Sequence, residues 1–210
     1  MYEPLYFSVT YGAGGSTQER TLDTVRQLID QGNNVTPHMS CIGATQSLIT
    51  DLLDQYTQQG IKRLVCLRGD LPSGAAISGG DFQYASDLVR YIRETTGDYF
   101  HIEVAAYPES HPEAANIQDD LLHYKAKCDA GANGAITQYF YDANAYEQLL
   151  NDCARLHIDT PITPGIMPIT NYTQLKRFSD MCGAQIPRWI QRRLEAFGDD
   201  TASFTHLALM

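Results

Sequence analysis

The chain is short of positive charge and of long hydrophobic runs. Lys and Arg number 15 against 25 Asp and Glu, which gives a net charge of -10. A nucleic-acid surface needs clustered cations, so this balance argues against one. An anionic small molecule stays compatible, because backbone N–H groups at helix N-termini hold phosphate without net positive charge. No apolar run approaches the roughly 18 residues of a membrane span, and we expect no membrane partner.

The cysteines lack the spacings of disulfide frameworks and metal sites. An odd number without a C-x-x-C pair predicts free thiols in a reducing compartment. Residues 1–10 lack the basic flank and apolar core of a signal peptide, and we expect a cytoplasmic protein. The five cysteines are Cys41, Cys66, Cys128, Cys153 and Cys182.

Several catalytic motifs are missing as well. The sequence contains no G-x-S-x-G, H-E-x-x-H or Walker A motif, and its six histidines show no metal-ligand spacing. We therefore expect no metal. Residues 12–15 form a Gly-rich turn after the first predicted strand but lack the G-x-G-x-x-G spacing of dinucleotide-binding folds.

What is present is a repeated strand–helix pattern. Each β-rich run is followed by a turn and a helical stripe, at intervals of roughly 30 residues, the size of a βα unit. The continuous apolar runs of these strands favour a parallel sheet buried on both faces. We predict an α/β fold in one domain spanning residues 1–210. The runs begin near Leu5, Val35, Arg63, His101, Gly134 and Pro161, and two helices, Tyr172–Met181 and Pro187–Phe197, follow the last.

Strict alternation fits either a Rossmann-type sheet or a TIM (β/α)8 barrel. The missing glycine fingerprint favours the barrel. With about six βα units, the sequence predicts an incomplete barrel that is two strands short of closure.

Polar side chains gather where the predicted strands end. Taken singly, each has an ordinary structural role: Thr10 as a strand former, His38 as a hydrogen-bonded histidine, Gln138 as a helix cap. Arg68 and Asp70 could form a local ion pair. Because the carboxyl ends of parallel strands share one rim, polar side chains at the ends of several strands predict a ligand site at that rim. A rim of this composition without a metal suits a bound cofactor.

The segment 105–114 extends this rim. An apolar strand ends at Tyr107-Pro108, His111 follows, and Pro112 is suited to open a helix that we predict over Pro112–Ala130. On that helix one face carries Asp120, His123 and Lys127, which is either a solvated face or a lining of the same site. Ile117, Leu121 and Cys128 form the predicted core stripe beside it.

These segments together resemble the 5,10-methylenetetrahydrofolate reductases of the bacterial, FAD-only kind. The resemblance runs in order through about residue 200. The segments that carry it are residues 8–16, 37–41, 68–72, 84–88, 105–109, 131–133, 135–138 and 164–168.

The resemblance implies a flavoprotein oxidoreductase of one-carbon metabolism. NADH, or NADPH, reduces FAD, and the flavin reduces 5,10-methylenetetrahydrofolate to 5-methyltetrahydrofolate for methionine synthesis. Asp70 is implied as a catalytic residue that faces the pterin and tunes the flavin. Gln138, Gln174 and Phe178 are implied to bind folate or nicotinamide. The implied FAD contacts are Thr10, Tyr11, Ala13, His38, Arg68, Gly69, Asp70, Ala85, Tyr107, His111, Asp120, His123 and Lys127.

The sequence also departs from the family pattern. His123 stands where the family usually has Asn and Ala126 where it usually has Arg, which we expect to weaken FAD binding. We expect the first and last strands of the barrel to be missing, and with the first strand the glutamate that donates a proton to the folate. Open strand edges then predict a marginal or aggregating monomer unless another chain fills the gap, and we expect a homo-oligomer.

Two other functions remain open. A non-catalytic remnant or fragment of a full-length reductase would bind FAD or folate without turnover. An aldolase-type barrel would need a Schiff-base lysine at a strand end, and none of the six predicted strands ends with one.

Overall fold

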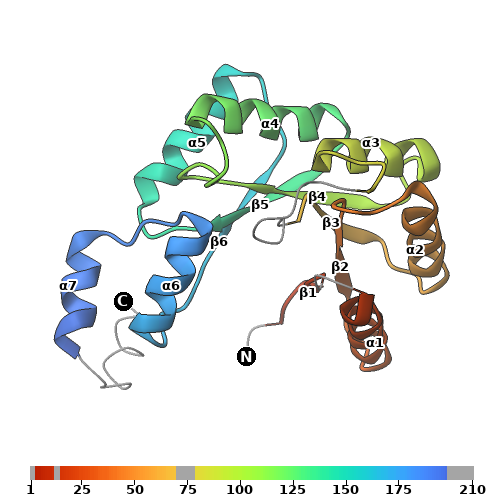
Figure 1. The fold of residues 1–210 in the computed structure, drawn as a ribbon, viewed down its shortest axis with the longest axis horizontal. Helices are drawn as coiled ribbons and strands as arrows, with labels where there is room; N and C mark the ends of the chain where they lie inside the picture. The colour runs from red at the N-terminus through yellow and green to blue at the C-terminus, as the bar shows by residue number, and fades with distance from the viewer. Residues whose placement is uncertain (1–2, 12–14, 70–78, 198–210) are drawn as a thin grey trace. The chain divides into compact units, whose positions relative to one another are not determined.

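A computed structural model describes residues 3–11, 15–69 and 79–197 of the chain, with the backbone alone at 15–19 and 197. Strands and helices alternate along the described residues until two helices follow in succession (Figure 1). The elements are β1 (Phe7–Val9), α1 (Gly15–Asp30), β2 (Val35–Ser40), α2 (Gln46–Gln58), β3 (Arg63–Leu67), α3 (Ala85–Thr96), β4 (His101–Ala106), α4 (Ile117–Asp129), β5 (Gly134–Tyr139), α5 (Ala143–Arg155), β6 (Ile162–Gly165), α6 (Tyr172–Cys182) and α7 (Arg188–Phe197).

The strands form one six-stranded sheet in the order β1-β2-β3-β4-β5-β6. The pairings from β1 to β4 are parallel, with Phe7 opposite Val35, His38 opposite Val65 and Arg63 opposite His101. The parallel α/β prediction is therefore confirmed. The six strands are consistent with an incomplete barrel, and its derivation from an eight-unit type stays a prediction.

The chain divides into two compact units, and the division passes through β4 and β5. The first comprises Met1–Ala105 with Ala126–Ala135, and the second Ala106–Lys125 with Ile136–Met210. The assignment of residues 1–210 to one domain stays a prediction.

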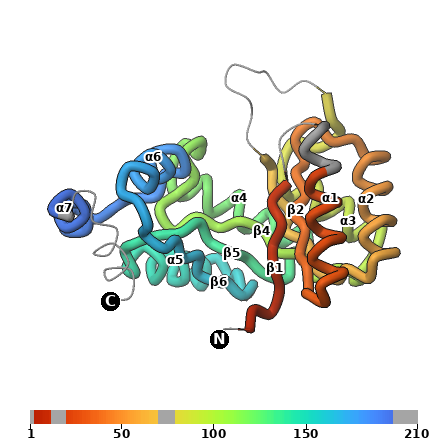
Figure 2. Tube along the Cα trace, turned by 90° about the horizontal axis from the view of Figure 1, so that it is seen from below, coloured from red at the N-terminus to blue at the C-terminus, as the bar shows by residue number. Residues whose placement is uncertain are grey.

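In the first unit, α1, α2 and α3 lie on the same side of strands β1 to β3 (Figures 1 and 2). The side chains of alternate strand residues are buried beneath them, as in Leu64 and Cys66, which are both fully buried. The helices contribute a matching apolar stripe, because their buried residues recur at a helical period. These are Ile49, Leu52, Leu53 and Tyr56 on α2 and Leu88, Val89 and Ile92 on α3.

The second unit has a smaller core beneath α6 and α7. Both helices are amphipathic, and each turns its apolar residues toward the end of β5. The buried members of this cluster are Tyr139, Ile169, Leu175, Ala184, Ile186, Ile190 and Leu194.

The helix predicted from Pro112 begins later. Residues 112–113 form a turn, residues 114–116 bend, and α4 starts at Ile117. The Asn116 side chain accepts the N–H of Asp119 at 2.9 Å and so caps the helix one residue before its start. Ile117, predicted in the core stripe, is 67% exposed, because it opens the helix and the buried residue of that face is Tyr124.

None of the helices in the described ranges is both long and apolar enough to cross a membrane.

Candidate functional site

The ends of β2 and β3 are tied together in the first unit. Ser40 Oγ donates to the Arg68 carbonyl at 2.8 Å, and the Ile42 N–H donates to the same oxygen at 2.9 Å. Gly69 has a φ of +87°, and a Cβ there would collide with Ser40 Oγ. Arg68 and Gly69 are thus held at the carboxyl end of β3, as the sequence predicts.

His38 lies on β2 directly opposite Val65. Burial lowers the pKa of its imidazole to about 4, because a buried cation loses its hydration. The ring is therefore neutral at physiological pH and offers one donor and one acceptor nitrogen.

Four further predicted contacts lie in the first unit. Thr10 is exposed and Tyr11 half-buried just after β1, and the Thr10 carbonyl accepts the Thr21 hydroxyl at 3.2 Å. Ala85 is buried at the start of α3. Lys127 reaches from α4 to the Ala105 carbonyl, where its Nζ donates at 2.5 Å. This cation stands at the end of β4, two residues before Tyr107.

In the second unit, Tyr107, His111 and Asp120 come together at the entry to α4. The rings of Tyr107 and His111 meet edge to face, with centroids 4.7 Å apart. The His111 N–H donates to Asp120 Oδ2 at 3.1 Å, and His111 Nδ1 accepts the Glu113 N–H at 3.1 Å. With Nδ1 accepting, the proton of a neutral His111 ring is on Nε2.

Gln138 lies at the end of β5, in the same unit. Its Oε1 accepts the N–H of Tyr139 at 3.1 Å. Gln138 and Tyr107 line one narrow crevice together with Glu109, Tyr139 and the turn after α6.

Gln174 and Phe178 lie one turn apart on α6. The N–H of Gln174 is capped by Asn171 Oδ1 at 2.9 Å, and its side chain is exposed. Phe178 is 50% exposed, and its ring stacks on Tyr139 with centroids 6.2 Å apart and an interplanar angle of 23°. A half-exposed ring with one face supported can stack on a flat ligand.

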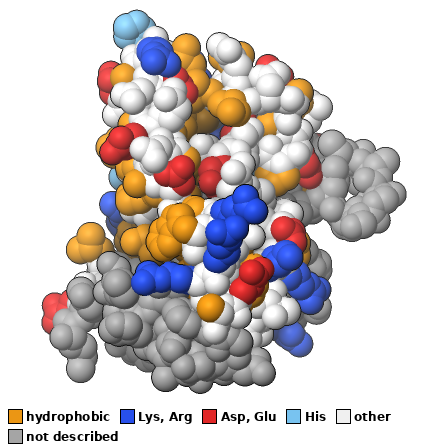
Figure 3. Space-filling model, turned by 90° about the vertical axis from the view of Figure 1, so that its left-hand side faces the viewer, with side chains coloured by type: hydrophobic (Ala, Val, Ile, Leu, Met, Phe, Trp, Pro, Cys, Tyr) orange, Lys and Arg blue, Asp and Glu red, His pale blue; other side chains and the backbone are white. Residues whose placement is uncertain are grey.

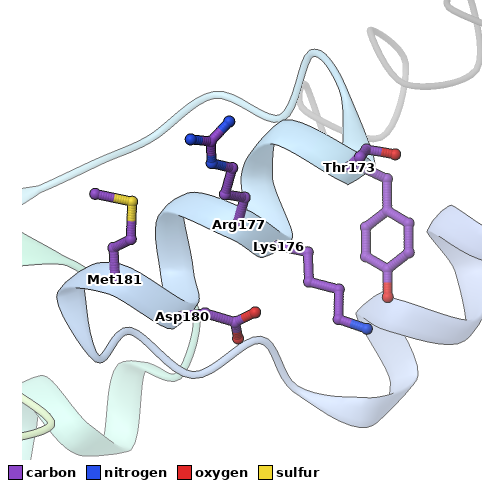
Figure 4. Close-up of a pocket in the computed structure, with 6 residues that line it drawn as sticks. Thr173, Lys176, Arg177, Asp180 and Met181 are labelled. Carbon is purple, nitrogen blue, oxygen red and sulfur yellow. The ribbon is translucent and has the colours of Figure 1, made fainter.

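An open hollow lies elsewhere on α6. It has a volume of about 470 Å³ and is lined by Tyr172, Thr173, Lys176, Arg177, Asp180 and Met181. Lys176 and Asp180 leave the helix on one side, Arg177 and Met181 on the other (Figure 4). Lys and Arg side chains gather beside hydrophobic ones on one face of the molecule (Figure 3). This open surface does not include Gln174 or Phe178, and we do not place the functional site there.

Two predicted site residues, Ala13 and Asp70, lie outside the described residues. His123 is exposed on α4, and Ala126 is half-buried. The described residues bring together no group of three or more His, Cys, Asp or Glu side chains that could hold a metal ion.

Sequence reasoning missed a hydrogen-bond network in the second unit. Glu109 Oε2 accepts the N–H of Gln185 at 2.8 Å, and Tyr139 Oη lies 2.9 Å from Ser179 Oγ. Burial raises the pKa of the Glu109 carboxyl, the bond from Gln185 lowers it and the charge of Asp142 raises it. No local pattern signals these contacts.

Each unit by itself offers groups that suit part of a flavin nucleotide. Tyr107 and His111 offer aromatic edges and faces for a flat ring system. Arg68 and Lys127 are half-buried cations at strand ends, suited to a diphosphate. Neutral His38 can hydrogen-bond without adding charge.

Two comparisons of the sequence with known proteins agree on one family. The sequence model described as methylenetetrahydrofolate reductase matches residues 1–209. The 5,10-methylenetetrahydrofolate reductase of Escherichia coli (strain K12) is 43% identical over 199 residues, which cover 94% of this chain and 66% of that protein. That of Buchnera aphidicola subsp. Schizaphis graminum is 38% identical over 204 residues, covering 95% and 67%. Methylenetetrahydrofolate reductase (NADH) 1 of Arabidopsis thaliana is 37% identical over 217 residues, covering 95% and 36%.

A solved structure of a 2,3-dimethylmalate lyase covers 88% of this chain and 64% of its own, with a TM-score of 0.47 and 13% identity, which is too remote to bear on function. The chain spans 66% of the length of the Escherichia coli relative. The match extends along nearly the whole chain and confirms the resemblance predicted from its segments. The chain belongs to the methylenetetrahydrofolate reductase family.

Proposed function

We propose that the chain binds FAD and takes part in the reduction of 5,10-methylenetetrahydrofolate to 5-methyltetrahydrofolate with NADH. The observation that carries this proposal is the paired rings of Tyr107 and His111, held by Asp120 at the carboxyl end of β4, in a chain of this family. NADPH as the alternative reductant, Asp70 as the catalytic residue and a cytoplasmic homo-oligomer belong to the same proposal.

Each described residue has a role that follows from its chemistry. Lys127 and Arg68 offset the charge of the diphosphate, and Tyr107 and His111 orient the ring system. Gln138 donates from Nε2, and Phe178 supports a flat substrate by stacking. Bound FAD would supply hydride chemistry, accepting hydride from the nicotinamide and giving it to the folate methylene.

Flavin binding and hydride transfer are tested separately. The purified chain, incubated with FAD and desalted, is expected to retain the visible flavin bands. Anaerobic NADH is expected to bleach them. Adding 5,10-methylenetetrahydrofolate to the reduced flavin then measures the second half-reaction, through the return of the bands and the formation of 5-methyltetrahydrofolate. A chain that takes up no flavin contradicts the proposal. One that binds flavin but is not bleached by NADH supports the non-catalytic alternative.

Lys127→Met tests the residue assignment. Loss of the cation is expected to raise the Kd for FAD about tenfold, which corresponds to about 1.4 kcal/mol. Lys125→Met, on the same helix, is the matched control and is expected to bind FAD as the unmodified chain does. The Kd is measured by quenching of flavin fluorescence. Equal Kd values for FAD in the two variants would show that Lys127 is not part of the flavin site.

A further inference from the structure

Glu109 has no part in the function proposed above, yet it connects two segments that do. It follows Pro108 directly after the end of β4, between Tyr107 and His111, and is half-buried. Its Oε2 accepts the backbone N–H of Gln185 at 2.8 Å. Gln185 lies in the loop after α6, the helix that carries Gln174 and Phe178. A carboxylate accepting a backbone N–H forms a charge-assisted bond, stronger than one between neutral groups.

The two segments also pack tightly around this bond. Gly183 caps the end of α6 with a φ of +77°, and a Cβ there would lie 3.0 Å from Pro112 Cγ and 3.6 Å from the Ser110 carbonyl. The crevice between residues 107–110 and residues 182–184 is too narrow to admit a water molecule. A displacement of α6 therefore has to break the Glu109 bond and these contacts together.

Strand β5 supports Phe178 from the middle of α6. Tyr139 stacks on the Phe178 ring and hydrogen-bonds Ser179 at 2.9 Å, which fixes the middle of α6 against β5. Cys182 Sγ adds a weak contact to the Tyr139 hydroxyl at 3.4 Å. The middle of α6 is thus held by β5, and its C-terminal end by the segment between Tyr107 and His111.

We propose that Glu109 is a positioning residue, which through its bond to Gln185 sets where Gln174 and Phe178 lie relative to Tyr107 and His111. It governs the binding of nicotinamide and folate and leaves flavin binding unchanged. This inference rests on the proposed function, because it assigns α6 to the substrate side of the site.

Glu109→Ala and Glu109→Gln test this role. With Glu109→Ala, the KM for NADH in anaerobic flavin reduction is expected to rise about tenfold, while the Kd for FAD stays within about twofold of the unmodified chain. Glu109→Gln keeps an amide oxygen that can accept the Gln185 N–H, and a smaller rise is expected. Glu147→Gln, an exposed carboxylate on α5, is the matched control and is expected to change neither value.

Amide hydrogen exchange supplies a readout that needs no flavin. In the flavin-free chain, the Gln185 amide is expected to exchange faster in Glu109→Ala than in Glu147→Gln, while the amides of β2 keep their rates. Unchanged exchange at Gln185 would overturn the bond itself.

The possible failures separate cleanly. A flavin-loaded, unmodified chain that NADH does not reduce overturns the proposed function and this inference with it. If the unmodified chain is active and Glu109→Ala has the same KM for NADH, the positioning role alone is overturned. A Kd for FAD that weakens as much as the KM rises would place Glu109 in the flavin site and overturn the role as stated.

Discussion

At the scale of single residues, His38 shows how burial decides charge. Its pKa of about 4 lies well below the usual value of 6.5, and the cause is loss of hydration. The unfolded chain binds the proton more readily than the folded chain. Stability from this group is therefore complete above the unfolded pKa and is lost as pH falls from about 6.5 toward 4.

His38→Gln tests this linkage. Between pH 7.5 and 5, the unmodified chain is expected to lose about 2 kcal/mol of unfolding free energy through His38, since each unit below the unfolded pKa costs about 1.4 kcal/mol. The Gln variant keeps polar groups but does not titrate, and lacks this loss. Urea unfolding at both pH values measures the difference. Parallel pH dependence in the two proteins would show that His38 is not buried as described.

Single residues also mark where sequence reasoning succeeds. Arg68 and Tyr107 could be predicted as strand-end groups, because the strand pattern and the parallel topology place such residues at one edge of a sheet. His38 lies inside β2, two residues before its end at Ser40. The contacts of Glu109 and Tyr139 could not be predicted. Their partners Gln185 and Ser179 lie 76 and 40 residues away, and no periodicity links such distant positions.

At the scale of elements, helix caps decide where the functional helices begin. The start of α4 was predicted at Pro112 because proline suits a first turn. The side chain of Asn116 caps the helix instead, which delays its start to Ile117. α6 begins where it was predicted, because Asn171 caps it directly before Tyr172.

Asn171→Ala tests the cap of α6. Loss of the bond that the Gln174 N–H donates to Asn171 Oδ1 is expected to cost about 1 kcal/mol of unfolding free energy. Because the first turn of α6 carries Gln174, we expect a higher KM for NADH with unchanged FAD affinity. Urea unfolding measures the loss of unfolding free energy, and anaerobic flavin reduction measures the KM for NADH.

Thr45→Ala is the matched control, because Thr45 Oγ1 caps α2 through the Leu48 N–H at 3.2 Å. It is expected to lose a similar stability without any change in KM. If both variants change KM equally, the effect is a general loss of stability and α6 has no special part in substrate binding.

At the scale of the whole molecule, the open question is whether the two units unfold together. The first unit contains a cluster of hydrogen bonds around Arg93. Its guanidinium donates to the Gly131 carbonyl at 2.9 Å and to the Phe100 carbonyl at 2.8 Å. It also donates to Asn133 Oδ1. The second unit contains Trp189, on α7. Since it is the one tryptophan of the sequence, its fluorescence reports on the second unit.

Arg93→Met separates one cooperative domain from two. Removing the guanidinium leaves partly buried carbonyls without their donor and is expected to cost about 3 kcal/mol. If residues 1–210 form one domain, urea transitions followed by Trp189 fluorescence and by far-UV circular dichroism coincide, and both shift by the same amount in the variant.

Arg155→Met, which removes an exposed ion pair with Asp152, is the control and should shift neither transition by more than about 0.5 kcal/mol. A Trp189 transition that stays in place while part of the dichroism change moves would divide the chain into two independently folding domains.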